Sequence, residues 1–178
     1  GYSALGANTT GANNVSIGQG SSGSNTTGSN NTAVGTEALN NNTTASNNTA
    51  FGFESLKANT TGTGGVAIGS GALAANTTGS YNIALGLNAL DENTEGTQNT
   101  ALGLSCLGSN ISGNFNNALG VGALAANTTA SNNTAVGHSS LSLLTSGERN
   151  TALGYNSGDI LTTGDDNVII GDRADADI

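Results

Sequence analysis

The chain contains no proline, methionine or tryptophan, one cysteine, and few charged or aromatic residues among its 178 positions. Charged residues make up 8% and aromatic residues 3%. The absence of proline suits long sheets, because proline would remove a ladder hydrogen bond. A single cysteine, Cys106, excludes an intrachain disulfide. No apolar run is long enough to suggest a spanning helix, and no signal peptide is visible.

Positive charge is especially scarce. Three cations, Lys57, Arg149 and Arg173, stand against twelve acidic residues, which gives a net charge of −9. Three scattered cations cannot neutralise a phosphate backbone, so we expect neither a nucleic-acid partner nor an anionic membrane surface. Half of the acidic residues fall near the end of the chain, where we expect a charged, soluble end rather than a metal site. They are Asp159, Asp165, Asp166, Asp172, Asp175 and Asp177.

What the chain does contain is a repeat of seventeen residues. Its strict period predicts stacked coils, whereas the composition alone would suggest disorder. We number the unit from its glycine as position 1. The unit then occurs ten times in residues 1–170, and residues 171–178 are expected to start a neck, a cap or a following domain of a longer protein. The repeated glycines are Gly1, Gly18, Gly35, Gly52, Gly69, Gly86, Gly103, Gly120, Gly137, Gly154 and Gly171.

Positions 15 to 17 of the unit predict a short strand. Position 15 is threonine or a β-branched apolar residue in all copies but one, position 17 is always large and apolar, and position 16 is alanine in eight copies. Alternation of this kind is typical of a strand. We expect the bulky residues to face a core and the alanines to form an outer row that another chain can approach closely. That row is Ala33, Ala50, Ala67, Ala84, Ala101, Ala118, Ala135 and Ala152.

Two columns of asparagine predict ladders of side-chain hydrogen bonds. Position 14 is asparagine in nine copies and position 8 in eight. Stacked turns place like residues above one another, so each amide can bond to the next. No apolar stripe with the helical period of 3.6 residues is present, which disfavours helix. The expected fold is therefore all-β, a parallel β-roll or β-solenoid of ten 17-residue coils.

A coil of seventeen residues has little core of its own. About three sizeable apolar side chains per coil contribute roughly 1.5–3 kcal/mol each when buried. Ordering the backbone costs roughly 1–2 kcal/mol per residue. An additional buried face would help to close this gap, so we expect chains to associate through the alanine column.

The phrase Asn31-Thr32-Ala33-Val34-Gly35 and its variants at 14–18, 65–69 and 167–171 resemble the head repeat of trimeric autotransporter adhesins. They are also similar to the Asn-Thr-Ala-Val-Gly repeats of phage and virus tail-fibre proteins. The resemblance implies a left-handed parallel β-roll packed as a homotrimer, located outside the cell on a bacterial surface or a virion tail fibre. The adhesin repeat is shorter than the seventeen residues found here, and we place the extra residues in the Asn-Thr-Thr turn.

No constellation of residues predicts an enzyme, a cofactor site or a metal site. Residues 18–23 match a dinucleotide-binding glycine pattern, but no helix is predicted after them. His138 has no predicted partner residue. Cys106 replaces the alanine or serine of other copies and is interpreted as a small buried residue. The Asn-Thr-Thr sequons, which begin at Asn8, are interpreted as turn ladders rather than glycosylation sites.

The expected function is that of a structural fibre segment of a trimeric adhesin or phage tail fibre, a rigid spacer with a role in host or surface attachment. Its expected partners are further copies of itself and a host-surface glycan or protein receptor, without membrane insertion. An ice-binding β-solenoid is one alternative, although adjacent threonines would point to opposite faces of a strand. The non-catalytic part of a glycan-cleaving tailspike is another, with Asp91, Glu92 and Glu95 as its acid cluster. Scattered aromatic residues such as Tyr81 and Phe115 favour a spacer over a binding segment.

The repeat changes near its end. Position 8 becomes Leu144 and then Leu161, preceded at position 7 by Leu143 and Ile160. Stacked apolar pairs on an exposed turn need cover. We expect all four side chains to be buried by a widened core or by a neighbouring chain.

Overall fold

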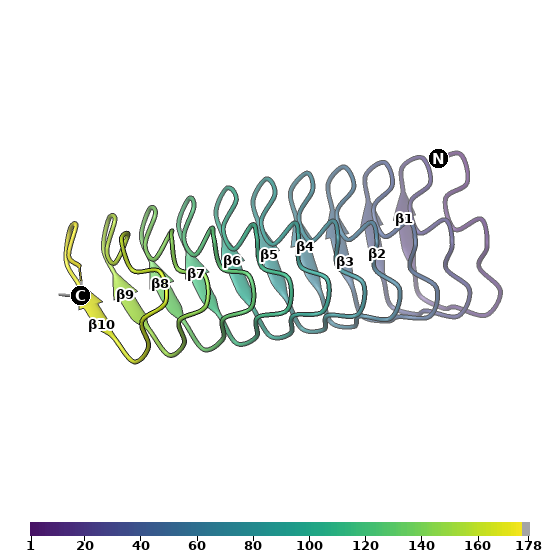
Figure 1. Ribbon diagram of the computed structural model, residues 1–178. Helices are drawn as coiled ribbons and strands as arrows, with labels where there is room; N and C mark the ends of the chain where they lie inside the picture. Colours follow the sequence, from purple (N-terminus) through teal and green to yellow (C-terminus); the bar gives the residue numbers. More distant parts are fainter. Residues whose placement is uncertain (176–178) are drawn as a thin grey trace.

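The computed structural model describes residues 1–175, which form a rod of stacked coils with the two termini at opposite ends (Figure 1). Ten three-residue strands make one sheet, in which the order of strands in space follows their order in the chain. This confirms the predicted all-β solenoid with one coil for each repeat unit. The strands are β1 (Val15–Ile17), β2 (Thr32–Val34), β3 (Thr49–Phe51), β4 (Val66–Ile68), β5 (Ile83–Leu85), β6 (Thr100–Leu102), β7 (Asn117–Leu119), β8 (Thr134–Val136), β9 (Thr151–Leu153) and β10 (Val168–Ile170).

Each strand pairs in parallel with the next and keeps an unchanged register. Ala33 of β2 lies beside Ala50 of β3, and Val34 lies beside Phe51. The same offset of one repeat unit holds from the β1–β2 pair to the β9–β10 pair. Equivalent positions of the repeat therefore form straight columns along the rod.

The glycine at position 1 ends each strand because no other residue fits there. Its φ lies between 131° and 142° in Gly18 and its equivalents, a region open only to glycine. A Cβ on Gly103 would also lie 2.5 Å from the carbonyl oxygen of Gly120 in the next coil. The recurring glycine thus combines an unusual backbone conformation with close approach of the neighbouring coil.

The backbone conformation at position 5 directs the leucine side chain into the coil. All eight leucines there have φ between 50° and 53°, a left-handed conformation that costs an ordinary residue about 1–2 kcal/mol. Leu39 and Leu73 are completely buried, and burying a leucine side chain contributes about 1.5–3 kcal/mol. Burial therefore offsets the backbone strain.

The prediction that the alanine column faces outward is wrong. Ala33, Ala50 and their equivalents point into the coil and are buried against the leucines of position 5. The bulky residues of position 17, expected in the core, lie instead on the outside of the sheet. The physical reason is the small cross-section of a 17-residue coil: once leucine occupies the interior, a methyl group is what fits opposite it.

The last coil shows the same limit on interior volume. Position 5 is Gly158 instead of leucine, and position 16 is Ile169 instead of alanine. Ile169 is 5% exposed, and its Cδ1 would lie 3.0 Å from a Cβ placed on Gly158. The larger side chain on the strand therefore fills the space that leucine fills in the other coils.

Both predicted asparagine ladders are present. At position 8, Nδ2 of Asn42 donates to Oδ1 of Asn25 at 2.9 Å and to the carbonyl oxygen of Ala45 at 3.0 Å. At position 14, Oδ1 of Asn31 accepts from the backbone amide of Asn48 at 3.0 Å, while its Nδ2 donates to the same carbonyl of Ala45 at 2.9 Å. One backbone carbonyl at position 11 thus joins the two ladders.

A threonine ladder runs beside them. At position 9 the hydroxyl donates to the carbonyl oxygen of the residue one coil on, as from Thr26 to Thr43 at 2.9 Å and from Thr77 to Thr94 at 2.9 Å. These hydroxyls satisfy backbone groups at a corner where the chain forms no regular strand. Polar side chains therefore hold the coils together where the sheet does not.

The apolar pairs near the end of the repeat behave differently from one another. Leu144 and Leu161 are buried in the core of their own chain, as expected. Leu143 and Ile160 are half-exposed, which corrects the expectation that all four would be covered. At position 7 the side chain points outward, whereas at position 8 it takes the inward place of the asparagine.

Residues 171–174 continue the path of the preceding coils. The amide of Gly171 donates to the carbonyl of Leu153 at 2.9 Å, and that of Arg173 donates to Tyr155 at 2.8 Å. The predicted neck or cap at 171–178 extends into residues 176–178, which lie outside the described part, and it stays a prediction.

Candidate functional site

The outer side of the sheet carries the most extensive apolar surface of the rod. In β5, Ile83 and Leu85 are exposed while Ala84 between them is buried. Position 2, which follows the strand across the glycine, is also exposed in copies such as Phe53 and Leu87. We call positions 15, 17 and 2 of every coil together the sheet face.

The sheet face holds most of the large apolar side chains that the described residues expose. Of the 21 exposed side chains of this kind, only five lie elsewhere: Tyr81, Ile111, Phe115, Leu143 and Ile160. An apolar surface this long is typical of an interaction site. The 16 exposed large apolar side chains on the sheet face are Tyr2, Val15, Ile17, Phe51, Phe53, Ile68, Ile83, Leu85, Leu87, Leu104, Leu119, Val121, Leu153, Tyr155, Val168 and Ile170.

The sheet face carries no acidic residue, lysine or arginine within residues 1–170. The acidic residues of the ten full units lie at other positions, and Asp172, at position 2, follows the tenth unit. Two copies can therefore approach through this face without bringing like charges together, which would otherwise oppose association.

His138 belongs to the sheet face at position 2. Its ring stacks on that of Tyr155 in the next coil, with centroids 5.3 Å apart and an interplanar angle of 25°. Cζ of Arg173 lies 5.6 Å from the Tyr155 centroid. The sequence suggested an isolated histidine, but the structure places it in a short stack of flat side chains.

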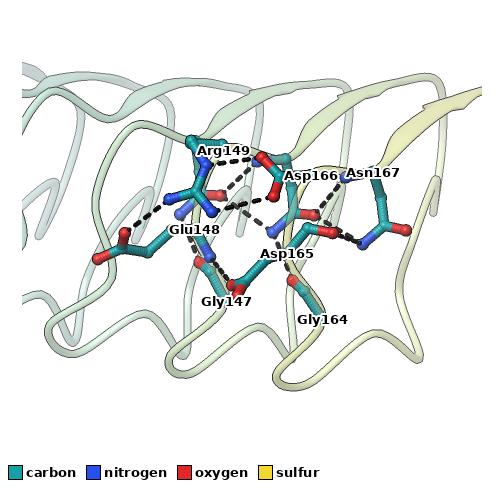
Figure 2. A network of polar contacts seen from close by, with 9 residues as sticks. Gly147, Glu148, Arg149, Gly164, Asp165, Asp166 and Asn167 are labelled. Carbon is teal, nitrogen blue, oxygen red and sulfur yellow. Dashed lines mark hydrogen bonds and ion pairs between the residues drawn. The ribbon is translucent and has the colours of Figure 1, made fainter.

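A network of charged residues occupies the turns of the last coils (Figure 2). Nε and Nη2 of Arg149 donate to the two carboxylate oxygens of Asp166 at 2.6 and 3.0 Å, and Nη1 reaches Glu148 at 3.0 Å. The Arg149 guanidinium lowers the pKa of Asp166. The backbone amide of Glu148 donates to Asp165 at 2.7 Å. Acidic side chains here join one coil to the next in place of asparagine and serine.

Lys57 forms a second set of ion pairs. Its Nζ lies 2.6 Å from Glu37 and 2.8 Å from Glu54, and both side-chain contacts raise the pKa of Lys57. Glu37 and Glu54 occupy position 3 of successive coils. The pairs are about one-third exposed, which is typical of surface ion pairs that add little stability.

The acid cluster considered for a tailspike lies on the outer turn of one coil. Glu92 and Glu95 are exposed, and Asp91 is partly buried. Burial raises the pKa of Asp91, and the nearby charge of Glu92 raises it further. Raised carboxyl pKa values occur in general acids, but they also occur wherever acids are crowded.

The other motifs have structural roles. Residues 18–23 form turns and are followed by no helix within the described chain. The sequon asparagines of the inner coils, such as Asn59 and Asn76, are buried with Nδ2 engaged in the ladder. Cys106 is buried, as interpreted, and its Sγ donates to the carbonyl of Ala118 at 3.1 Å. Burial raises the pKa of this thiol to about 12.

Sequence reasoning missed the sheet face because it placed the wrong side of the strand inside. One signal was available in position 15, where five copies are threonine and Asn117 occurs once. A polar residue at that position is easier to place in solvent than in a narrow apolar interior. The near-uniform alanines and the variable bulky residues fit the same assignment.

No protein-family model, curated protein or solved structure matches this chain. Within residues 1–175, no group of three or more histidine, cysteine, aspartate or glutamate side chains is placed to hold a metal ion. The same part of the chain contains no helix long and apolar enough to cross a membrane.

Proposed function

We propose that this chain is a rigid structural segment of a fibrous surface protein, of the adhesin or tail-fibre kind, and that three copies pack together through their sheet faces. The observation that carries the proposal is the largely apolar sheet face, which has no acidic residue, lysine or arginine within residues 1–170. Its role as a spacer outside the cell rests on the resemblance of the repeat to fibre proteins.

The structure changes which surface the association would use. The alanine column is inside the coil and cannot contact another chain. Phe51, Leu85 and Leu119 of position 17 are exposed and lie along one line, so three parallel rods could bury them around a common axis. Complete burial of such a side chain contributes about 1.5–3 kcal/mol. Association would therefore add apolar burial that the narrow core of a single coil does not provide.

Sedimentation equilibrium of the purified chain tests the proposal, with an expected mass of three chains. Replacing Leu85 and Leu119 by threonine keeps strand preference but removes apolar area, and should shift the chain toward monomer. Leu143→Thr is the matched control, since Leu143 is 53% exposed but lies off the sheet face. A wild-type chain that stays monomeric at micromolar concentration would contradict self-association, and a dimer or tetramer would contradict threefold packing.

The ice-binding alternative has less support. The hydroxyls of position 9, as in Thr26 and Thr77, donate to backbone carbonyls of the next coil, so they are engaged within the chain. Thermal hysteresis of the purified chain distinguishes this alternative from a fibre segment. For the tailspike alternative, the corresponding measurement is turnover of host glycans before and after Asp91→Asn and Glu92→Gln.

A further inference from the structure

Position 13 departs from its usual residue in four consecutive coils. It is asparagine in the first three coils, and then Gly64, Tyr81, Gln98 and Phe115 follow one another before asparagine returns. Tyr81 is 62% exposed and Phe115 is 50% exposed, and neither lies on the sheet face. Two exposed aromatic rings in one column, separated by an amide side chain, form an arrangement found nowhere else in the repeat.

Gly64 makes room for the first ring. A Cβ on Gly64 would lie 2.7 Å from Cδ1 and 3.0 Å from Cε1 of Tyr81. The Tyr81 ring therefore occupies the space that a side chain at position 13 would take one coil earlier. Gly64 is the only glycine at position 13, and Tyr81, whose ring uses the space, occupies the same position in the next coil.

The column is straight and its backbone is held in place. The amides of Tyr81, Gln98 and Phe115 donate to the carbonyls of Thr63, Ser80 and Thr97 in the preceding coil, at 2.8, 3.0 and 3.1 Å.

Side chains of adjacent coils also contact one another elsewhere in this column. Nδ2 of Asn13 donates to Oδ1 of Asn30, and Arg149 binds Asp166.

The sheet sets the spacing of the two backbone positions that carry the rings. Neighbouring strands lie about 4.8 Å apart, so residues two coils apart in one column are separated by about 9.6 Å. This distance is close to the repeat of an extended β-1,4-linked glycan, in which alternate sugar rings present the same face. The apolar faces of sugars stack on aromatic rings, while amides and carboxylates bind their hydroxyl groups.

We propose that Tyr81, Gln98 and Phe115 form a binding platform for an extended β-1,4-linked glycan that lies along the rod. Tyr81 and Phe115 stack on alternate sugar rings, and the Gln98 amide binds hydroxyl groups of the sugar between them. Glu95, exposed on the same coil as Gln98, offers a carboxylate to further hydroxyl groups. The proposal names a ligand for the proposed fibre segment and rests on that function for its setting, but the platform lies within one chain.

Isothermal titration calorimetry with cellohexaose and chitohexaose tests the platform and distinguishes glucose from N-acetylglucosamine chains. Maltohexaose, which is α-linked and curved, is the geometry control. We expect at least one β-linked hexamer to bind and maltohexaose not to bind. Tyr81→Ala and Phe115→Ala should each weaken binding about tenfold, whereas Tyr81→Phe should retain it.

Two control variants match these changes. Leu143→Ala removes an equally exposed apolar side chain from another column and should leave glycan binding unchanged. Gly64→Ala should weaken binding because it displaces the Tyr81 ring. Gly122→Ala has a similar starting φ, 65° against 67°, but its Cβ would make only an ordinary contact, 3.7 Å from Oγ of Ser139, and should leave binding unchanged.

The proposal is overturned if neither β-linked hexamer binds, or if the alanine variants bind as the parent does. It is also overturned if Tyr81→Ala and Phe115→Ala alter the sedimentation mass and leave glycan binding intact, since the two rings would then belong to an interface between chains. Leu85→Thr with Leu119→Thr should alter the mass and not glycan binding to the isolated chain, so failure of the platform and failure of self-association give different results.

Discussion

Leu144 stands one coil beyond Asn127, at the point where the asparagine ladder of position 8 ends. Nδ2 of Asn127 donates to Oδ1 of Asn110 at 2.7 Å, but its own Oδ1 is buried with no hydrogen-bond partner among residues 1–175. Leu144 supplies no amide to this oxygen and packs into the core instead. The ladder therefore gives way to apolar packing, at the cost of one unsatisfied acceptor.

Replacing Leu144 and Leu161 together by asparagine should lower the stability of this end. Losing two buried leucines costs about 3–6 kcal/mol. Four new ladder hydrogen bonds return about 4 kcal/mol, and the unsatisfied acceptor moves from Asn127 to the side chain introduced at position 161 without a net change in their number. We expect a net loss of up to about 2 kcal/mol, measured by urea unfolding and by faster hydrogen exchange after residue 140.

The half-exposed neighbours provide the control for this variant. Leu143→Asn with Ile160→Asn changes the same coils and the same residue types, but removes little burial and should alter stability by less than about 0.5 kcal/mol. If the two double variants lose the same stability, inward packing of Leu144 and Leu161 does not determine the stability of this end.

Burial of the Cys106 thiol should make the stability of the folded chain depend on pH. Burial raises the pKa of Cys106 to about 12, against about 8.5 in an unfolded chain. The folded protein then holds the proton more tightly, so the stability from this residue is complete below pH 8.5 and declines as the pH rises toward 12. Cys106→Ala, which places there the residue of the adjacent coils, should remove this decline.

Reactivity provides the direct measurement. At pH 8 the folded chain should react with a thiol reagent only as fast as it opens, whereas the urea-unfolded chain should react at the rate of a free cysteine. Rapid, stoichiometric labelling of the folded chain would show that Cys106 is accessible and that its pKa is not raised.

Much of the fold could be predicted because the repeat puts each residue type in a column. The glycine period predicts the stacking. The alternation at positions 15 to 17 then predicts the strand, and the two asparagine columns predict the ladders. The orientation of the strand could not be predicted in the same way, because alternation separates two faces without saying which is inside. The left-handed backbone of residues such as Leu39 decides it, since it turns leucine inward and leaves room only for a methyl group such as that of Ala33.

The candidate surfaces were harder to predict for a related reason. Phe51 and Leu85 were assigned to a core by their size, although their column is outside. Tyr81 and Phe115 both stand at position 13, so the repeat alone places them in one column, but their exposure and the space beside Gly64 come from the structure. The role of Gly64 follows only from the position of the Tyr81 ring, whose Cδ1 would lie 2.7 Å from a Cβ on this glycine.

The repeat glycine should tolerate no side chain. Gly103→Ala combines a φ of 140° with a Cβ only 2.5 Å from the carbonyl oxygen of Gly120, and should cost about 3–5 kcal/mol. Gly122→Ala, with a φ of 65° and its nearest neighbour atom 3.7 Å away, should cost about 1–2 kcal/mol. Denaturant unfolding of both variants measures the difference, and equal losses would mean that the neighbouring coil yields without cost.

Gly65 interrupts the asparagine ladder of position 14. The effect of this interruption on stability can be measured by comparing Asn76→Ala with Asn110→Ala. The carbonyl of Gly113 accepts from both Asn110 and Asn99, at 3.1 and 2.8 Å. The carbonyl of Gly79 accepts from Asn76 at 3.0 Å and has no second side-chain donor within the described residues, because Gly65 stands where asparagine would supply one.

Asn76→Ala should therefore destabilise the chain by about 1–2 kcal/mol more than Asn110→Ala. Only Asn76→Ala leaves a buried carbonyl, that of Gly79, without a side-chain donor. Gly65→Asn should rescue the difference, because its amide can donate to the Gly79 carbonyl and its Oδ1 can accept from the amide of Asn82. Urea unfolding of the two single variants, each with and without Gly65→Asn, measures this coupling. A penalty for Asn76→Ala that is no larger, or that persists with Gly65→Asn, would show that the shared carbonyl does not couple the two ladders.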